Sequence, residues 1–300
     1  MYKKETFTAV ILFFILQICF AQSSFQNLEL GKNSLNYKGN PLKATDRKSL
    51  AFSDKGAWFG FGFLEQSEMQ GGFSGPFLMT EQNGVWLSSS FISLHLTDKN
   101  EQELIDWKTA LVNQNSYNSH LEQEFQNEKL EVKQQLVFSS GHSAIQKTSI
   151  TNRSSKTITL YPIYNSKTYL DNMQLSTEGQ FLKLVSSKSN AVGYIQFFNE
   201  GIDIVITKDS FTAKANKLTL KPNETKEIVV SQTYIFPQYD WKKENENLAK
   251  IQFNTVLKDT KKEKENQLAQ LIAKKKSIYK GAEYSIFIAK LLLTLQNNTR

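Results

Sequence analysis

The sequence predicts a mainly β protein, a large antiparallel β-sandwich followed by helices. Two observations carry this prediction. Between residues 130 and 236, short runs rich in β-branched and aromatic residues alternate with turns of Asn, Ser, Gly and Lys, and no helical pattern separates them. After Pro237 the composition changes to good helix formers, with neither Gly nor Pro until Gly281. Closely spaced strands without intervening helices are typical of a sandwich and not of a parallel α/β sheet.

The N-terminus has the pattern of a secretory signal, residues 1–21. Lys3 and Lys4 precede an apolar run over residues 7–20, and Cys-Phe-Ala provides a small residue for cleavage before Gln22. The run is shorter than the ~20 apolar residues that cross a bilayer, so a membrane anchor is the less favoured interpretation. We expect an exported protein, periplasmic or secreted, with no membrane partner after cleavage.

Cysteine and histidine usage predicts no metal site and no cofactor. The single cysteine, Cys19, lies in the predicted signal, so the mature chain lacks a disulfide, a thiolate nucleophile and a Cys ligand. His95, His120 and His142 show no i, i+4 pairing. We expect each of them to be a strand or surface histidine.

The positive charge of the chain is concentrated at its C-terminal end. The net charge is +7, and residues 241–300 hold 13 Lys/Arg against 6 Asp/Glu, whereas residues 22–240 hold 21 against 22. The C-terminal lysines are mixed with glutamates and apolar residues, as on a solvated helix face. We therefore expect no nucleic-acid partner.

Each predicted strand has a local signal. In residues 157–161, Thr-Ile-Thr-Leu-Tyr alternates hydroxyl-bearing and apolar side chains, which predicts one buried face. Residues 218–236 predict two strands joined by a Pro-Asn-Glu turn. Residues 100–114 fit a helix or a strand equally well. The other predicted strands are 130–140, 143–150, 157–164, 191–198 and 201–207.

The last sixty residues predict helices. Beyond Gly281, apolar residues recur at helical spacing from Tyr284 to Leu295 and form one stripe. Such a stripe must pack on another surface, so we expect the sequence to be the front part of a longer polypeptide with a helical domain after it. The predicted organisation is a signal peptide over 1–21, a β-sandwich domain over 22–240, a helical linker over 241–280 and the start of a helical domain over 281–300.

The stretch GGFSGPFLMTEQNGVWLSSS, residues 71–90, raises the question of a catalytic loop. Ser74 does not fit the G-x-S-x-G elbow, because the second glycine comes one position early. Gly60-Phe61-Gly62 lacks the third glycine of a phosphate-binding loop. Four carboxylates could supply an acid and a base, but the sequence does not give their separations: Asp54, Glu65, Glu68 and Glu81.

Three stretches together resemble a known family. The order D-K-G-A-W-x-G (54–60), G-G-F-S-G-P (71–76), a β-sandwich, a basic helical segment and L-L-T-L-Q-N-N-T-R (292–300) resembles the N-terminal part of glycoside hydrolase family 63. These are the processing α-glucosidase I-like enzymes and their bacterial relatives. The resemblance implies a supersandwich and, after the linker, the first helix of a truncated (α/α)6 barrel. It places the acid and base carboxylates in that barrel, so no catalytic residue is expected in this chain.

The resemblance implies an exported glycosidase that hydrolyses α-glucosides or oligosaccharides with inversion. Its partners would be the oligosaccharide substrate and its own C-terminal α-helical catalytic domain. Inversion requires two carboxyl groups ~6.5–9.5 Å apart with a water between them. The 300-residue chain alone would then be inactive. The alternative is a non-catalytic carbohydrate-binding or scaffold sandwich.

For the glycine-rich stretch, the structural interpretation is favoured over a catalytic one. Gly71, Gly72 and Gly75 permit close backbone approaches that a Cβ would block. Trp58 and Phe73 are the candidate substrate-binding residues, because an aromatic face can stack on a pyranose ring. We expect Trp58 to stabilise the core and Phe73 to lie on an exposed bend.

Overall fold

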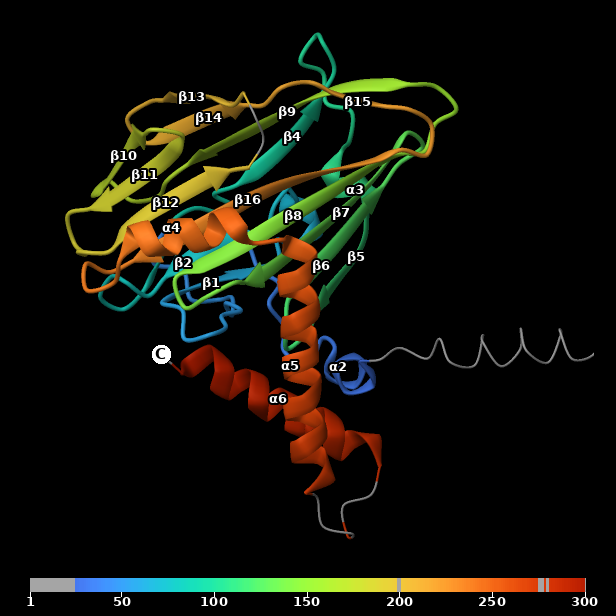
Figure 1. Ribbon diagram of the computed structural model, residues 1–300, viewed down its shortest axis with the longest axis vertical. Helices are drawn as coiled ribbons and strands as arrows, with labels where there is room; N and C mark the ends of the chain where they lie inside the picture. Colours follow the sequence, from blue (N-terminus) through green and yellow to red (C-terminus); the bar gives the residue numbers. More distant parts are fainter. Residues whose placement is uncertain (1–24, 199–200, 275–277, 279–280, 300) are drawn as a thin grey trace, which may run out of the picture.

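The computed structural model describes residues 25–198, 201–274, 278 and 281–299. The signal peptide predicted over 1–21 lies outside these residues. Antiparallel sheets face each other across one continuous hydrophobic core, with helices at one end (Figure 1). The predicted mainly β, sandwich-like fold with C-terminal helices is confirmed.

The larger layer is an eight-stranded sheet in the order β10-β11-β12-β16-β8-β7-β6-β5. All neighbouring strands are antiparallel, and the long strands β8 and β16 lie at the centre. The strands are β5 (Leu111–Ser116), β6 (Leu121–Gln126), β7 (Leu130–Phe138), β8 (Ser143–Asn152), β10 (Met173–Glu178), β11 (Phe181–Ser186), β12 (Val192–Phe197) and β16 (Thr225–Ile235).

The facing layer is built around β9, which pairs with β4, β14 and β15, while β13 pairs with β14 at the edge. A small sheet of β1, β2 and β3 completes the sandwich. These strands are β1 (Phe59–Gly62), β2 (Ser74–Leu78), β3 (Val85–Trp86), β4 (Ser93–Thr97), β9 (Ile158–Lys167), β13 (Asp203–Ile206), β14 (Ser210–Lys214) and β15 (Leu218–Leu220). Every strand predicted between residues 130 and 236 is present.

The ambiguous segment 100–114 contains both elements. Residues Trp107–Ala110 form the single turn α3, and β5 begins directly after it at Leu111. Asp106 caps α3 by accepting a hydrogen bond from the backbone N–H of Lys108 at 3.1 Å. A short capped turn followed at once by a strand explains why neither pattern dominated the sequence.

Aromatic rings fill the centre of the sandwich. Phe59 lies with its ring centroid 4.8 Å from that of Tyr234 and 5.3 Å from that of Phe138. Phe61 of β1 and Phe52, from the segment before β1, also pack against Phe138. Tilted and edge-to-face contacts of this kind add stability beyond the area they bury. The core therefore joins β1 to the middle of the eight-stranded sheet.

The predicted helical linker is two helices, α4 (Trp241–Lys250) and α5 (Phe253–Ala273). Helix α4 and the start of α5 cover the outer face of the eight-stranded sheet, where Leu248 and Phe253 pack on Val137. The rest of α5 projects from the sandwich (Figure 1). In the part of the chain that the structure describes, no helix is both long enough and apolar enough to cross a membrane. The predicted domain boundaries stay predictions.

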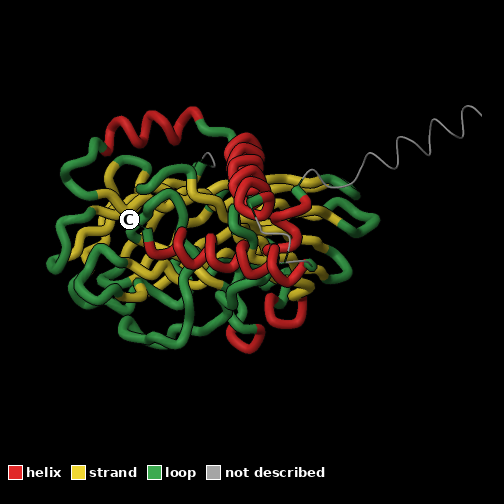
Figure 2. Tube along the Cα trace, turned by 90° about the horizontal axis from the view of Figure 1, so that it is seen from below, coloured by secondary structure: helices red, strands yellow, loops and turns green. Residues whose placement is uncertain are grey.

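The final helix, α6 (Ala282–Asn298), meets α5 and the short helix α2 (Gln26–Gly31) beneath the sandwich. Figure 2, seen from below, shows α6 crossing this end of the sheets. The helix is buried on its small residues, such as Ser285 and Ala289, and on Leu293. Phe287, Leu291 and Leu295, which belong to the predicted stripe, are 54%, 44% and 64% exposed.

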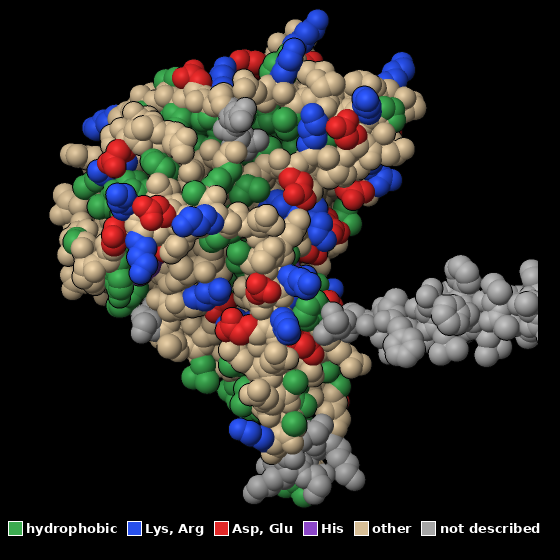
Figure 3. All heavy atoms as spheres, in the orientation of Figure 1, with side chains coloured by type: hydrophobic (Ala, Val, Ile, Leu, Met, Phe, Trp, Pro, Cys, Tyr) green, Lys and Arg blue, Asp and Glu red, His purple; other side chains and the backbone are tan. Residues whose placement is uncertain are grey.

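Charged side chains of both signs are interspersed around α5. Figure 3 shows acidic and basic groups side by side there, and apolar side chains gathered near α6. This arrangement agrees with the mixed Lys/Glu composition of the segment. The exposed apolar residues of α6 form the main uncovered hydrophobic feature of the described helices.

Candidate functional site

The glycine-rich segment lies inside the sandwich. The carbonyl oxygens of Gly71 and Gly72 accept hydrogen bonds of 2.9 Å from the side-chain amides of Gln134 and Gln123, both fully buried. A Cβ at Gly71 would lie 2.0 Å from the Leu94 carbonyl oxygen, which is a severe clash. The glycines therefore permit a buried backbone contact, which confirms the structural interpretation of this stretch.

Ser74, the serine of this stretch, is not placed as a nucleophile. Its side chain is fully buried, and among the described residues its hydroxyl has no hydrogen-bond partner. A nucleophilic serine needs a neighbouring base and access for the substrate. Ser74 has neither of these, so the stretch does not form a catalytic loop around it.

The two aromatic candidates have the opposite exposures to those expected. Phe73 is 3% exposed and packs 5.9 Å from Phe63, so the expected exposed bend is wrong. The cause is the anchoring of Gly71 and Gly72 inside the sandwich. Trp58 is 43% exposed, so its expected core position is also wrong. It precedes Phe59, which points into the core, and neighbouring residues in extended chain point to opposite sides.

These positions separate the two candidates as sugar-binding residues. The ring of Phe73 is enclosed by the core and has no free face for a pyranose. Trp58 contacts Phe236 edge-on, with ring centroids 5.9 Å apart, and keeps an exposed surface. Substrate binding by Trp58 stays a prediction.

Asp54 is engaged in a buried ion pair. Its Oδ1 lies 2.7 Å from the Nζ of Lys264 on α5, and the two side chains are 2% and 7% exposed. Burial raises the pKa of the Asp54 carboxyl, while Lys264 works in the opposite direction. Lys264 occupies the same face of α5 as the buried Leu257 and Leu268. A lysine within an apolar stripe is the sequence signal that could have revealed this pair.

Of the other candidate carboxylates, Glu81 is held by neighbouring side chains, whereas Glu65 and Glu68 are exposed. Glu81 is buried and accepts hydrogen bonds from Ser186 and, at 2.9 Å, from the amide of Asn172. Glu65 and Glu68 lie exposed at the two sides of a short 3-10 turn. Asp54 and Glu81 therefore serve the structure.

His120 is buried, so its expected position in a strand or at the surface is wrong. Its ring stacks on Tyr117 at 4.6 Å, its Nδ1 lies 2.8 Å from the hydroxyl of Ser119, and its Nε2 lies 3.8 Å from Glu122. Burial lowers the pKa of His120 to about 4. Burial works against ionisation of Glu122, but its contacts with His120 and Lys133 lower its pKa to about 2.

Contacts link Ser119 to His120 and His120 to Glu122, the three residue types of a hydrolytic triad, but their burial excludes catalysis. Ser119 and His120 have no exposed surface, and Glu122 has 8%. A substrate carbonyl cannot reach the serine, and a histidine that stays neutral to about pH 4 is held as a packing residue. The group therefore fixes the turn before β6.

The remaining histidines make isolated contacts. His95 lies in β4, as expected, and contacts Glu103 and, at 3.1 Å, the side-chain oxygen of Asn165. His142, before β8, packs its ring 4.2 Å from Tyr239. Within the described residues, no group of three or more His, Cys, Asp or Glu is placed to hold a metal ion.

Residues next to the stretches that carry the family resemblance lie close to the C-terminal end of α6. The N–H of Ser53 donates to the Oδ1 of Asn297 at 3.0 Å, and the amide of Gln296 donates to the Ser53 carbonyl at 3.1 Å. Met79, from the glycine-rich stretch, donates its N–H to the carbonyl of Trp58 at 2.8 Å. Segments far apart in the sequence are thus joined in one contact region.

A hollow of about 330 Å³, the junction hollow, opens in this contact region. Arg47 lines it, with its guanidinium 5.4 Å from the centre of the Phe77 ring and donating to the Gly84 carbonyl at 2.7 Å. The hollow combines apolar and polar groups from the sandwich and from α6. Its lining residues are Leu35, Asp46, Arg47, Ser49, Leu50, Ala51, Phe77, Met79, Thr294, Asn297 and Asn298.

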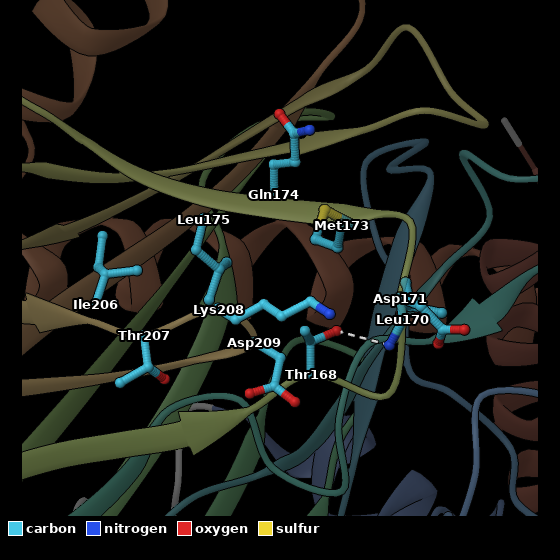
Figure 4. A pocket seen from close by; sticks show the side chains of 10 residues that line it. All are labelled: Thr168, Leu170, Asp171, Met173, Gln174, Leu175, Ile206, Thr207, Lys208 and Asp209. Carbon is cyan, nitrogen blue, oxygen red and sulfur yellow. Dashed lines mark hydrogen bonds between the residues drawn. The ribbon is translucent and has the colours of Figure 1, made fainter.

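A second hollow of about 710 Å³, the edge groove, lies between the β9–β10 connection and the β13–β14 turn (Figure 4). It opens where the edge strands of the two layers, β10 and β13, come together. Aliphatic and polar side chains line it. They are Thr168, Leu170, Asp171, Met173, Gln174, Leu175, Ile206, Thr207, Lys208 and Asp209.

The fold, together with the sequence of the sandwich, defines an N-terminal domain of the glycoside hydrolase type. The chain belongs to the family described as glucosidase YgjK, N-terminal, whose profile matches residues 39–193. This match includes two of the three stretches identified above. Among curated proteins, no sequence relative was found.

Solved structures with low sequence identity are similar to the chain. A provisionally assigned kojibiose phosphorylase from the human microbiome superposes with a TM-score of 0.57 at 12% identity, over 82% of this chain and 39% of that one. A family GH92 α-mannosidase from Bacteroides thetaiotaomicron gives 0.48 at 10% identity, over 81% of this chain and 37% of that one. The chain thus spans about two fifths of the length of these structures.

Proposed function

We propose that the chain is the N-terminal domain of an exported glycoside hydrolase that acts on α-glucosides or oligosaccharides with inversion. The observation that carries this proposal is the family match over residues 39–193. The finer assignment to glycoside hydrolase family 63 rests on the sequence resemblance of residues 54–60, 71–76 and 292–300. The acid and base would lie in a C-terminal helical catalytic domain outside residues 1–300.

The chemistry of the described carboxylates supports this division of labour. An inverting enzyme needs one protonated and one ionised carboxyl group on opposite sides of the sugar, ~6.5–9.5 Å apart. Asp54 is occupied by Lys264, and Glu81 by Ser186 and Asn172. Neither is free to exchange a proton with a glycosidic oxygen or a water.

In this proposal the sandwich positions the catalytic domain. Helix α6 would be the first helix of that domain, and the contacts of Gln296 and Asn297 with Ser53 fix its direction. Asp54 and Lys264 fix α5, which contacts α6. The exposed Phe287, Leu291 and Leu295 would be covered by the following helices, since an apolar patch is expected to find a partner surface.

The test compares the product of the whole gene with the 300-residue chain. We expect the whole product to release glucose from α-linked disaccharides and aryl α-glucosides, and the chain alone to release none. Proton NMR at early times should show β-glucose, the inverted anomer. Initial release of α-glucose would refute inversion, and hydrolysis by the chain alone that is lost in Asp54→Asn or Glu81→Gln would refute the division of labour.

Export is tested separately by cell fractionation. We expect the protein outside the cytoplasm, with an N-terminus at or near Gln22. An intact Met1 in the cytoplasmic fraction would refute it.

A further inference from the structure

The edge groove is separate from the region that holds α6. Its walls come from residues 168–175, at the edge of the eight-stranded sheet, and residues 206–209, at the edge of the facing layer. In Figure 1, β10 and β13 lie at the far side of the sandwich from α5 and α6. A ligand in this groove would therefore leave the junction with α6 free.

The groove has an aliphatic floor and a polar rim. Leu170 and Met173 are 5% and 7% exposed, and Leu175 and Ile206 are half-buried beside them. In Figure 4 the side chain of Lys208 extends across the groove toward the wall that carries Thr168 and Asp171. The volume of about 710 Å³ falls in the range of small-molecule sites, ~300–1,000 Å³.

The wall of the groove is held rigid by internal contacts. The N–H of Thr168 donates to the Asp209 carbonyl at 2.8 Å, and its hydroxyl accepts from the N–H of Leu170 at 3.0 Å. Asp209 also pairs with Lys167, with Oδ2 and Nζ 2.9 Å apart. These bonds hold the start of the β9–β10 connection against the β13–β14 turn within the facing layer, where β14 pairs with β9.

Three polar groups of the rim are free to bind a ligand. Within the described residues, no hydrogen bond or ion pair occupies the carboxylate of Asp171, the amide of Gln174 or the ammonium of Lys208. A carboxylate only accepts hydrogen bonds, an ammonium only donates, and an amide does both. The ligand must therefore present donors and acceptors together.

We propose that the edge groove binds a neutral oligosaccharide outside the catalytic domain. Asp209 is paired with Lys167, and Asp171 and Lys208 carry opposite charges, so the rim has no excess charge that would select an anion or a cation. Sugar hydroxyls donate and accept, and the C–H faces of a pyranose match the aliphatic floor. The choice of α-linked glucose units as ligand rests on the proposed function. Such a site would hold a long substrate near the enzyme and raise its effective concentration.

The experiment measures binding apart from hydrolysis. The 300-residue chain is titrated with maltotetraose and isomaltotetraose by isothermal titration calorimetry, alongside an Asp171→Ala/Lys208→Ala double variant. Lys217→Ala, an exposed lysine of the same layer outside the groove, is the matched control. Circular dichroism melts confirm that each variant is folded, as expected for exposed positions.

We expect at least one tetrasaccharide to bind the native chain. Its affinity for the double variant should be about tenfold lower, and its affinity for the Lys217→Ala control should be unchanged. Absence of binding to both sugars, or equal binding by the double variant, would overturn the proposal. Stronger binding of an anionic tetragalacturonate would do so as well. Hydrolysis by the whole gene product is scored independently, so either proposal can fail while the other stands.

Discussion

Replacing Lys264 by Met is expected to destabilise the protein strongly. The Lys264 and Asp54 side chains are 7% and 2% exposed, and their charged atoms are 2.7 Å apart. Asp54 also accepts a hydrogen bond of 2.8 Å from the N–H of Lys55, but its Oδ2 has no partner among the described residues. Without Lys264 the buried carboxylate loses its counter-charge. Breaking a buried pair in this way costs ~3–5 kcal/mol.

A double-mutant cycle isolates the interaction. Asp54→Asn alone leaves the ammonium of Lys264 buried and unpaired, so it should also be costly. Asp54→Asn combined with Lys264→Met leaves no buried charge, so the double variant should be less destabilised than the sum of the single variants by about 2–3 kcal/mol. Urea unfolding followed by tryptophan fluorescence gives the free energies.

The matched control is Lys214→Met. Lys214 pairs with Glu101 at 2.9 Å, but the two side chains are 55% and 71% exposed. Exposed pairs contribute ~0–1 kcal/mol, so this variant should unfold almost like the native chain. Equal effects of Lys264→Met and Lys214→Met, or additive effects of the Asp54 and Lys264 changes, would refute the argument.

The remaining predictions concern pH, the core and association. The unfolded chain binds a proton at His120 below pH 6.5, whereas the folded chain does so only near pH 4, so stability should fall as the pH drops through this window, by about 3 kcal/mol in total. The urea midpoint of a His120→Gln variant should not show this dependence on pH. Plots of midpoint against pH that run parallel for the variant and the native chain would contradict the prediction. Phe73→Ala should lower stability by ~3–5 kcal/mol and Trp58→Ala by about 1 kcal/mol; thermal melts in the reverse order would show the exposures to be misassigned. The exposed stripe of α6 should make the chain self-associate, and Leu291→Ser/Leu295→Ser should shift it to monomer in sedimentation velocity, while a monomeric native chain would exclude this.

Between residues 130 and 236, most of the strand pattern could be predicted because its signals are local. Alternation at 157–161 predicts β9, and the Pro-Asn-Glu turn at 222–224 predicts the turn between β15 and β16, without reference to distant residues. The β10–β11 hairpin was missed because most of β10 is exposed or half-buried, so its sequence lacks a clear apolar alternation. Periodicity likewise identified the stripe of α6, since helical spacing is a property of the segment itself.

The tertiary structure alone decided which side chains are covered. Phe73 and Trp58 are both aromatic residues within two positions of a glycine. The hydrogen bonds from Gln123 and Gln134 hold the backbone next to Phe73 inside the sandwich, whereas Trp58 stays partly exposed. Burial depends on which distant strands pass over a residue, and this information is not contained in neighbouring residues.

The same reason applies to the ion pair and the groove. Asp54 and Lys264 are 210 positions apart, and their pairing exists only because α5 returns across the end of the sandwich. The edge groove requires the beginning of β10 to lie beside the end of β13, which the topology of the two sheets determines. The sequence by itself determined most of the strands after residue 130, the C-terminal helices and the family resemblance. Contacts between remote segments determined which charges are paired, which side chains are exposed and which hollows are available for function.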